Sequence, residues 1–368
     1  MVVRDFHPLR VAEVVRLCDD AVAVTFEVPA ELTGTYAFRP GQSLTIRRAG
    51  DGADERRSYS ICAPAGERPR IGVREVPGGL VSSWLVHGLR PGDEVEVAPP
   101  SGTFTPDLDA VDGDVLIAAG SGITPVISIA ASLLRRPDTQ VSILYGNRRA
   151  DTVMFAEELA DLKDTHPSRL ELVHLLSREA REVELLTGRL DAAKLRTLLP
   201  LLIDVHGVEH WWLCGPFGMV TDATEVLGEF GVEPARIHRE LFWVDEAPPE
   251  PVREEAGPRG PSSEVTVVLD GRSTTVTVPE GDTVLEGAQR SRPDLPFACK
   301  GGVCGTCRAR VVDGEVEMRR NFALELGRGG RGLRAHLPVD ADHGQGSGQL
   351  RRLTTVAPPS CSPRPVRR

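Results

Sequence analysis

The sequence predicts a multidomain protein of mixed α/β and β class, with an antiparallel β-barrel first, a doubly wound parallel sheet second and a small β-rich unit last. Three observations favour this order. The 368 residues fit two or three domains of ordinary size. Short alternating apolar runs are replaced after Leu108 by buried runs that alternate with helical segments. A proline-rich segment then precedes three closely spaced cysteines.

Composition excludes several function classes. With 40% hydrophobic and 26% charged residues, the chain is typical of a soluble globular protein. The net charge of −10 argues against a nucleic-acid partner, which needs a basic face. Glycines and Pro125 interrupt the longest uncharged stretch, Val115–Leu134, so we predict strand, loop and helix there and no membrane partner. No apolar signal segment follows Met1, which favours a cytoplasmic location.

Residues 1–110 have the pattern of an antiparallel barrel. Val22–Val28, Ser43–Ile46 and Asp93–Ala98 alternate with period two or are rich in β-branched residues, and Gly and Pro separate them. We therefore expect the first domain to be a β-barrel that ends near residue 110.

Residues 111–245 have the pattern of a parallel, doubly wound sheet. Four buried strand-like runs alternate with helical segments such as Phe155–Lys163. The runs are Val115–Ala119, Val141–Tyr145, Leu170–Leu175 and His210–Cys214. Residues 246–262 contain five prolines and no apolar period, which predicts a semi-extended linker.

Residues 263–325 begin with a β-hairpin signal. Val265–Leu269 and Ser273–Val278 flank Asp270-Gly271, a dipeptide typical of tight hairpin turns. A helix is predicted to start near Asp282, whose side chain is suited to cap it.

Cys299, Cys304 and Cys307 have the C-x4-C-x2-C spacing of a plant-type 2Fe-2S ligand loop. Four thiolates must surround two irons, and the glycines between these cysteines let the backbone approach the sulfides. The alternatives are unrelated buried thiols or part of a zinc site. The glycines and the hairpin and helix upstream favour the cluster. Cys18 and Cys62, in contrast, are expected to be core residues.

Two motifs in the barrel are suited to bind a pyrophosphate and a ring. Arg57–Ser60 reads Arg-Ser-Tyr-Ser, in which the arginine can neutralise a pyrophosphate and the tyrosine can stack on a ring. The glycine-rich turn Gly78–Ser82 exposes backbone amides that can bind phosphate. Either motif alone also fits an ordinary surface strand or turn, and their order within one barrel favours the functional interpretation.

A third motif, Gly120–Pro125, ends a predicted strand and opens a helix. It reads Gly-Ser-Gly-Ile-Thr-Pro, so proline replaces the third glycine of the dinucleotide fingerprint G-x-G-x-x-G. Its position still places amides and a helix N-terminus where a dinucleotide would lie.

These motifs, followed by Leu213–Met219, occur in the order found in the ferredoxin-NADP reductase superfamily, which the chain resembles from about Arg10 to Glu325. The C-terminal cysteine loop resembles a plant-type ferredoxin of the β-grasp fold. Together they resemble the reductase components of multicomponent oxygenases. Segments that resemble the reductase subunits of phenylacetyl-CoA epoxidases in particular are Tyr145–Arg148, Phe155–Lys163, Leu185–Leu190 and Cys299–Cys304.

The resemblance implies roles for individual residues. FAD would be held by Arg57, Tyr59 and Ser60, and its pyrophosphate by Ser82 with the amides of Gly79, Leu80 and Val81. Gly120 and Gly122 would form the dinucleotide turn, and Thr124 would lie beside the isoalloxazine and the nicotinamide. The nicotinamide slot would be lined by Cys214, Gly215 and Pro216. The strand from Glu240 to Phe242 would close over the flavin. The residues expected at the reacting rings are thus Thr124, Cys214 and Glu240.

Ser177-Arg178 ends a predicted strand at the place where NADPH-preferring members of the superfamily bind the 2′-phosphate. A hydroxyl beside a guanidinium suits a dianion, whereas selection of NADH usually requires a carboxylate on the ribose. The alternative is a solvated loop, so NADPH is favoured and NADH stays open.

Electron counting then predicts the function. NADPH gives up two electrons as a hydride and a 2Fe-2S centre accepts one at a time, so a flavin must divide the pair. We expect an NAD(P)H-dependent oxidoreductase that feeds an oxygenase partner. The alternatives are the reductase of a Rieske-type steroid or aromatic-ring oxygenase, and a flavin-only reductase. In the latter the C-terminal unit is non-functional or binds zinc through the three loop cysteines and His336.

The C-terminal end departs from the pattern of the superfamily. A fourth cysteine is expected about thirty residues after Cys307, near Leu337, and the only later cysteine is Cys361. Residues 326–368 hold eight Arg, seven Gly, five Pro and two acids, and we expect them to be disordered, without strands. A basic binding tail is one interpretation. We favour a shifted reading frame, because codons permitted by this sequence can encode a cysteine across the Leu337 and Pro338 codons. The ferredoxin-like domain is therefore expected to be incomplete.

Overall fold

The computed structural model describes residues 6–50, 53–110, 113–243, 262–269, 272–279, 282–291, 295, 307–311, 316–318, 334–336, 339–341 and 351–354. The chain divides into two compact units, one of Phe6–Pro248 and one of Pro249–Arg368 together with Met1–Asp5. Within the described part of the chain, no helix combines the length and apolarity that a bilayer crossing requires.

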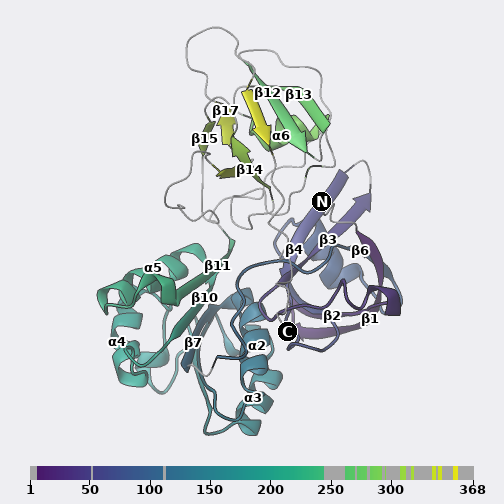
Figure 1. Ribbon diagram of the computed structural model, residues 1–368. Helices are drawn as coiled ribbons and strands as arrows, with labels where there is room; N and C mark the ends of the chain where they lie inside the picture. Colours follow the sequence, from purple (N-terminus) through teal and green to yellow (C-terminus); the bar gives the residue numbers. More distant parts are fainter. Residues whose placement is uncertain are drawn as a thin grey trace, which may run out of the picture. The chain divides into compact units, whose positions relative to one another are not determined.

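The first domain is the predicted antiparallel barrel, built from six strands in the order β4-β3-β6-β1-β2-β5 (Figure 1). The strands are β1 (His7–Cys18), β2 (Ala21–Glu27), β3 (Ser43–Gly50), β4 (Ala53–Ser60), β5 (Arg70–Arg74) and β6 (Glu94–Val97). An isolated bridge between Ile61 and Ile71 joins the β4 and β5 edges and closes the sheet. Alternate side chains, among them Val22, Val24 and Phe26, fill the interior, as the period-two pattern predicted.

A short helical segment covers one part of this barrel. It consists of α1 (Leu80–Ser83) and the π-helical turn η2 (Trp84–Gly88), which directly follow the glycine-rich turn. Leu85 and Val86 are buried in the barrel core, so the apolar face of the segment fixes the position of the turn before it.

The second domain is a five-stranded parallel sheet in the order β11-β10-β7-β8-β9. Its strands are β7 (Gly113–Ala119), β8 (Gln140–Asn147), β9 (Leu170–Leu176), β10 (His210–Pro216) and β11 (Ile237–Trp243). Its helices are α2 (Ile123–Leu133), α3 (Ala156–Thr165), α4 (Ala192–Leu202) and α5 (Phe217–Glu229). Its short 3-10 turns are η3 (Gly120–Gly122), η4 (Ala150–Thr152), η5 (Glu184–Leu186) and η6 (Pro234–Arg236), and the barrel contains one more, η1 (Ala30–Leu32). This is the doubly wound sheet that the sequence predicted.

Helices cover both faces of this sheet (Figure 1). Leu116 and Ala118 of β7 pack in one cluster with α2 and α3, whereas Val115 and Ile117 pack in a second cluster with α4 and α5. Because both faces are covered, the strands are continuously apolar rather than alternating. The first cluster also includes Ala21 and other barrel residues, so the barrel packs on the α2 and α3 side.

The C-terminal unit contains a mixed sheet in the order β13-β12-β18-β14-β16 and a separate β15-β17 pair. The strands are β12 (Ser262–Leu269), β13 (Arg272–Pro279), β14 (Arg308–Val311), β15 (Val316–Met318), β16 (Arg334–His336), β17 (Val339–Ala341) and β18 (Arg351–Thr354). The predicted hairpin is confirmed as the antiparallel β12-β13 pair, although its Asp270-Gly271 turn lies outside the described residues. Helix α6 (Val284–Gln289) packs on β13, where Gly287 lies against Val278.

Two expectations for this unit are wrong. Thr283 rather than Asp282 caps α6, because Glu286 three residues later completes a capping box with Thr283, while Asp282 pairs with Arg290. Three short strands, β16, β17 and β18, lie in the segment that we expected to have none. β18 occupies the gap between β12 and β14, whose backbone groups would otherwise lack partners.

Candidate functional site

The second domain has a topological switch point between β7 and β10. The chain runs from β7 through β8 to β9 on one side of the sheet, and β10 and β11 lie on the other side. Ligands of such sheets bind in the crevice at the carboxyl ends of the strands on either side of the switch. Those ends carry two predicted motifs, Gly120–Gly122 after β7 and Gly215-Pro216 at the end of β10.

The two motifs meet directly at this crevice. A Cβ on Gly122 would lie 2.1 Å from the carbonyl oxygen of Cys214 and 2.8 Å from the nitrogen of Gly215. Gly120 has a φ of +56°, in the left-handed region that favours glycine. No side chain therefore fits at position 122, and the turn after β7 can pack against the backbone of β10 only as glycine.

Tyr145 and Thr124 hold the Gly120–Gly122 turn in place through hydrogen bonds to its backbone carbonyls. The buried Tyr145 hydroxyl donates a hydrogen bond of 3.0 Å to the carbonyl of Gly120, and burial raises the pKa of this phenol. The Thr124 hydroxyl in the first turn of α2 donates to the carbonyl of Ser121 at 2.9 Å, and the residue is 1% exposed. The turn is thus held in place at the start of α2.

Cys214, Glu240 and Ser60 come together at the edge of the same crevice. The parallel register pairs Cys214 of β10 with Glu240 of β11, and the Ser60 hydroxyl of β4 donates to Glu240 Oε2 at 3.3 Å. Burial raises the pKa of the Cys214 thiol well above its usual value, with the Glu240 charge as a second cause. The thiol is therefore neutral and serves as an apolar wall, not as a nucleophile. Phe242 packs against the cluster that contains Cys214.

The barrel strand β4 presents the predicted flavin residues. Arg57 forms an ion pair of 2.8 Å with Glu55 and donates to the carbonyl of Arg56. Tyr59 is packed against the barrel core, and burial raises the pKa of its hydroxyl. The guanidinium therefore keeps donors for a phosphate at the surface while the tyrosine ring is held in place, which fits a bound flavin nucleotide.

The glycine-rich turn is shaped by Ser82. Its hydroxyl accepts from the amide of Val76 at 3.1 Å and bonds to the carbonyl of Gly79 at 3.2 Å, and Gly78 has a φ of +74°. The Ser82 hydroxyl, which we expected to bind the pyrophosphate, thus stabilises the turn through hydrogen bonds to its backbone. The amides of Leu80 to Ser82 have no acceptor within α1, because they form its first turn, so backbone is what this turn offers to phosphate.

Arg48 is a candidate that sequence reasoning missed. Its guanidinium donates to the carbonyl of Leu80 at 2.8 Å and lies over the Trp84 ring at 5.4 Å. It therefore adds positive charge beside the amides of α1. No local motif marks it, since β3 and α1 are thirty residues apart in the chain.

Ser177 and Arg178 follow β9 at the carboxyl edge of the sheet, as predicted. Their amides donate to the carbonyls of Asn147 and Arg148 at 2.9 and 2.8 Å, which holds this loop beside the end of β8. Arg178 and Arg148 are exposed, and neither forms an ion pair within the described part of the chain, whereas Arg149 pairs with Asp151. Two unpaired guanidinium groups at this edge suit a phosphate dianion.

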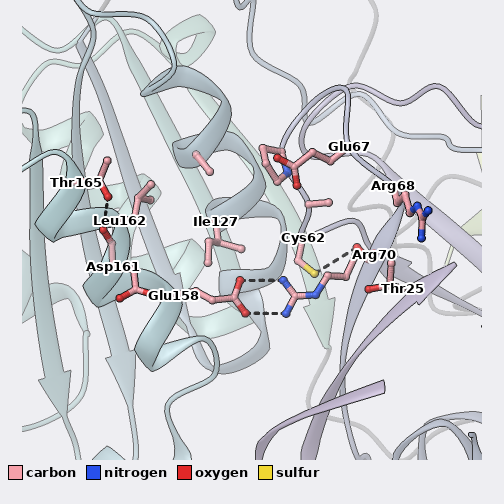
Figure 2. Close-up of a pocket in the computed structure, with 13 residues that line it drawn as sticks. Thr25, Cys62, Glu67, Arg68, Arg70, Ile127, Glu158, Asp161, Leu162 and Thr165 are labelled. Atoms are coloured by element: carbon pink, nitrogen blue, oxygen red, sulfur yellow. Dashed lines mark hydrogen bonds and ion pairs between the residues drawn. The ribbon is translucent and has the colours of Figure 1, made fainter. Parts of the chain in front are cut away.

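A cavity of about 630 Å³ lies elsewhere, between the barrel and helices α2 and α3. Figure 2 shows a bidentate ion pair in its lining, in which Arg70 binds both carboxylate oxygens of Glu158, and the two contacts measure 2.7 and 2.8 Å. Cys62, a buried thiol, lines it too, and none of the predicted site residues does. The cavity is therefore separate from the predicted nucleotide site.

The predicted cluster loop is described only at Cys307. This cysteine precedes β14, is 1% exposed and belongs to the core of its unit, while Cys299 and Cys304 lie outside the described residues. Among the residues that the structure describes, no three metal-binding side chains gather. His336, the alternative zinc ligand, lies on β16, where its backbone is paired with Arg308.

Three parts of this chain match families of known domains. Residues 8–105 match the oxidoreductase FAD-binding domain family, residues 116–225 the oxidoreductase NAD-binding domain family and residues 267–333 the 2Fe-2S iron-sulfur cluster binding domain family.

Two curated relatives and one solved structure extend over most of the chain. A subunit of the 1,2-phenylacetyl-CoA epoxidase from Escherichia coli (strain K12) is 40% identical over 87% of this chain and 90% of its own. The ferredoxin reductase component of 3-ketosteroid-9-alpha-monooxygenase from Rhodococcus rhodochrous is 34% identical over 86% and 89%. The structure of phthalate dioxygenase reductase aligns with a TM-score of 0.61 over 95% of this chain and 98% of its own, at 21% identity. This last similarity concerns the fold.

Proposed function

Because the chain belongs to the ferredoxin reductase-type oxidoreductases that join FAD-, NAD- and 2Fe-2S-binding domains, we propose that it supplies electrons from NADPH to the oxygenase component of a multicomponent system. The observation that carries this proposal is the 40% identity to an epoxidase subunit over 87% of this chain and 90% of that subunit, in a chain that matches all three domain families. We propose a phenylacetyl-CoA epoxidase as the oxygenase and the cytoplasm as the location.

The barrel would hold FAD at β4 and at the turn before α1. Arg57 and Arg48 would balance the pyrophosphate charge, and the amides of the Gly79–Ser82 turn would donate to its oxygens. Tyr59 would lie along the ring system, with Ser60 fixed by its bond to Glu240. Bound FAD would supply the one capacity that no side chain has, which is to take two electrons together and release them singly.

The crevice between β7 and β10 would hold the nicotinamide half of NADPH. The Gly120–Gly122 turn and the start of α2 would bind phosphate through backbone amides. Cys214, Gly215 and Pro216 would line the ring and exclude water with Thr124, while Ser177 and Arg178 would bind the 2′-phosphate. The task of these residues is alignment of the donor carbon with the flavin, for which a well-oriented site is worth many orders of magnitude in rate.

The iron-sulfur site would be held by Cys299, Cys304 and Cys307. Three thiolates from one loop agree with the 2Fe-2S family match, and Cys307 is part of the core, so metal binding there would be coupled to folding of the unit. The fourth ligand is not supplied by this sequence near Leu337. We propose that a frame shift after Glu325 removed it, which sequencing of the gene across that codon tests. Codons that do not permit the cysteine would contradict it.

The function is tested with the purified full chain. We expect a yellow protein with one FAD per chain, rapid bleaching by NADPH under anaerobic conditions, and faster turnover with NADPH than with NADH when ferricyanide is the acceptor. Protein that stays colourless after incubation with FAD would refute the proposal. Stimulation of a phenylacetyl-CoA epoxidase rather than of a Rieske-type steroid oxygenase, each supplied as purified oxygenase component, would distinguish the proposed partner from the alternative that the 34% identical relative represents.

A further inference from the structure

Gly72 lies in the middle of β5, the barrel strand that contacts the second domain. Its neighbours Ile71 and Val73 are fully buried in the barrel core, so position 72 faces the other way. A Cβ on Gly72 would lie 2.4 Å from Thr124 Cγ2 and 2.9 Å from Phe155 Cζ. Both distances are shorter than carbon atoms tolerate. The methyl of Thr124 and the ring of Phe155 thus occupy the space that a side chain would need.

Strand β5 is held on both sides of this contact. Arg70, two residues before Gly72, forms the bidentate ion pair with Glu158 of α3 that Figure 2 shows. Arg74, two residues after it, donates to the carbonyl of Thr152 before α3. The strand also pairs with β2 along its length. A larger residue at position 72 therefore cannot be accommodated by a shift of β5 alone.

Phe155 is fixed by its own backbone. It has a φ of +57°, the one positive value among the described residues other than glycine, and it is the N-cap of α3. Non-glycine residues keep such a conformation when their surroundings determine it. Its ring is 2% exposed and lies under the Arg70 guanidinium at 5.5 Å. The ring therefore has little freedom to move away from Gly72, and displacement falls on Thr124.

Thr124 links this contact to the nucleotide crevice. It opens α2 directly after the Gly120–Gly122 turn, and its hydroxyl is bonded to the carbonyl of Ser121 at 2.9 Å. A displacement of its methyl would break that bond or move the turn. We propose that Gly72 is a positioning residue for electron transfer from NADPH. Because Gly72 has no side chain, the Thr124 methyl packs directly against β5, and this contact sets the distance between the nucleotide turn and the flavin strands. The inference depends on the proposed function.

The test is Gly72→Ala in the full chain. Under anaerobic rapid mixing, we expect the limiting rate of FAD reduction at saturating NADPH to fall at least about ten-fold, because a misplacement of about 1 Å is costly for aligned reactants. The dissociation constant for NADPH should rise by a smaller factor than the limiting rate falls, since the 2′-phosphate contacts proposed for Ser177 and Arg178 are untouched even if the Gly120–Gly122 turn moves. Gly34→Ala is the matched control, because a Cβ there meets nothing within 4 Å. FAD content and melting temperature are measured for both.

A second variant separates positioning from general damage. Thr124→Ser removes the methyl and keeps the hydroxyl, so it relieves the clash with a side chain at position 72. Adding Gly72→Ala to the Thr124→Ser variant should therefore lower the limiting rate of FAD reduction by a smaller factor than adding Gly72→Ala to the parent. If Gly72→Ala retains no FAD, Phe155→Leu replaces it, and a several-fold lower limiting rate with full FAD content is expected. Parent-like rates in these variants, or losses that follow FAD content without rescue, would overturn the inference. An unaltered chain that NADPH does not reduce would refute the proposed function itself.

Discussion

The unit of Phe6–Pro248 and the C-terminal unit are stabilised in different ways. The first has a closed barrel and a sheet covered on both faces, and residues of every strand belong to one of three apolar clusters or pack against one. In the second, the described core consists of ten residues, and one of them is Cys307 of the ligand loop. The proposed cluster ligand Cys307 is therefore also a core residue of this unit. From this difference we expect the flavin unit to fold and react without the cluster, and the C-terminal unit to need the metal for folding.

The largest effect should come from restoring the fourth cysteine. We compare the printed chain with one that carries the alternate reading frame from residue 326 onward. The printed chain should hold FAD and little iron, whereas the restored chain should bind about two irons and reduce cytochrome c, because four thiolates then surround the cluster. Iron analysis and the visible spectrum measure this. Ferricyanide reduction by NADPH should agree within about two-fold between the chains, since it needs only the first unit.

Equal iron content in the two chains would contradict the expectation that the printed chain lacks a fourth cluster ligand. It would mean that the C-terminal unit completes its cluster from another group, of which Cys361 is the only cysteine available after Cys307. Cys361→Ser in the printed chain decides between these outcomes.

The next effect concerns the core of the first unit. The Trp212 indole donates a hydrogen bond of 2.8 Å to Asp114 Oδ1, and both residues are buried. Asp114→Ala leaves that N–H without its acceptor and should lower the free energy of unfolding by about 2–3 kcal/mol. Asp114→Asn keeps an acceptor and should cost less than about 1 kcal/mol. Denaturant titration followed by tryptophan fluorescence measures both, and an equal loss for the two variants would contradict this account.

The iron content of the restored chain is the control for that experiment. If the two units are stabilised separately, Asp114→Ala should leave iron binding unchanged while the flavin unit is weakened. Loss of iron together with flavin would show that the units stabilise each other.

Local periodicity predicted most of the fold, and its failures have physical causes. The alternating apolar runs located the barrel and the continuous ones the parallel sheet. A strand buried on one face needs apolar residues at alternate positions, and a strand buried on both faces needs them throughout. β18 has no such pattern, and its place is determined by the unpaired edges of β12 and β14. Asp and Thr are both residue types that cap helices, and Thr283 rather than Asp282 is the cap because Glu286 completes a capping box with Thr283.

The site could be predicted only where its residues form local motifs. Gly120–Gly122 and Arg57–Ser60 have fixed spacing, and resemblance assigned roles to them. The bond between Ser60 and Glu240 joins positions 180 residues apart, and the seat of Thr124 on Gly72 joins two domains. Such contacts depend on how the barrel packs on α2 and α3, which no short stretch of sequence records.

The third prediction tests nucleotide selection in the first unit. Arg178→Ala should raise the KM for NADPH about ten-fold and leave the KM for NADH within about two-fold, because a charge-assisted contact to the 2′-phosphate is lost. Steady-state ferricyanide reduction measures it. Arg149→Ala is the control, since that guanidinium is paired with Asp151. An equal rise for both nucleotides would remove Arg178 from the phosphate site.

The smallest effect should be the pH dependence of the first unit. His238 stacks on Trp212 at 4.0 Å, and burial, followed by the charge of His210, lowers the pKa of His238 to about 4. In the unfolded chain the pKa would be about 6.5, so between those two values the unfolded state takes up a proton that the folded state does not. The free energy of unfolding should therefore fall as pH decreases from about 6.5 to 4 and level off below that. The difference in melting temperature between the parent and His238→Phe, which keeps an aromatic ring on Trp212, isolates this contribution from other titrating groups. A difference that stays constant across that pH range would show that His238 does not titrate as expected, and the first unit would then owe its acid sensitivity to other residues.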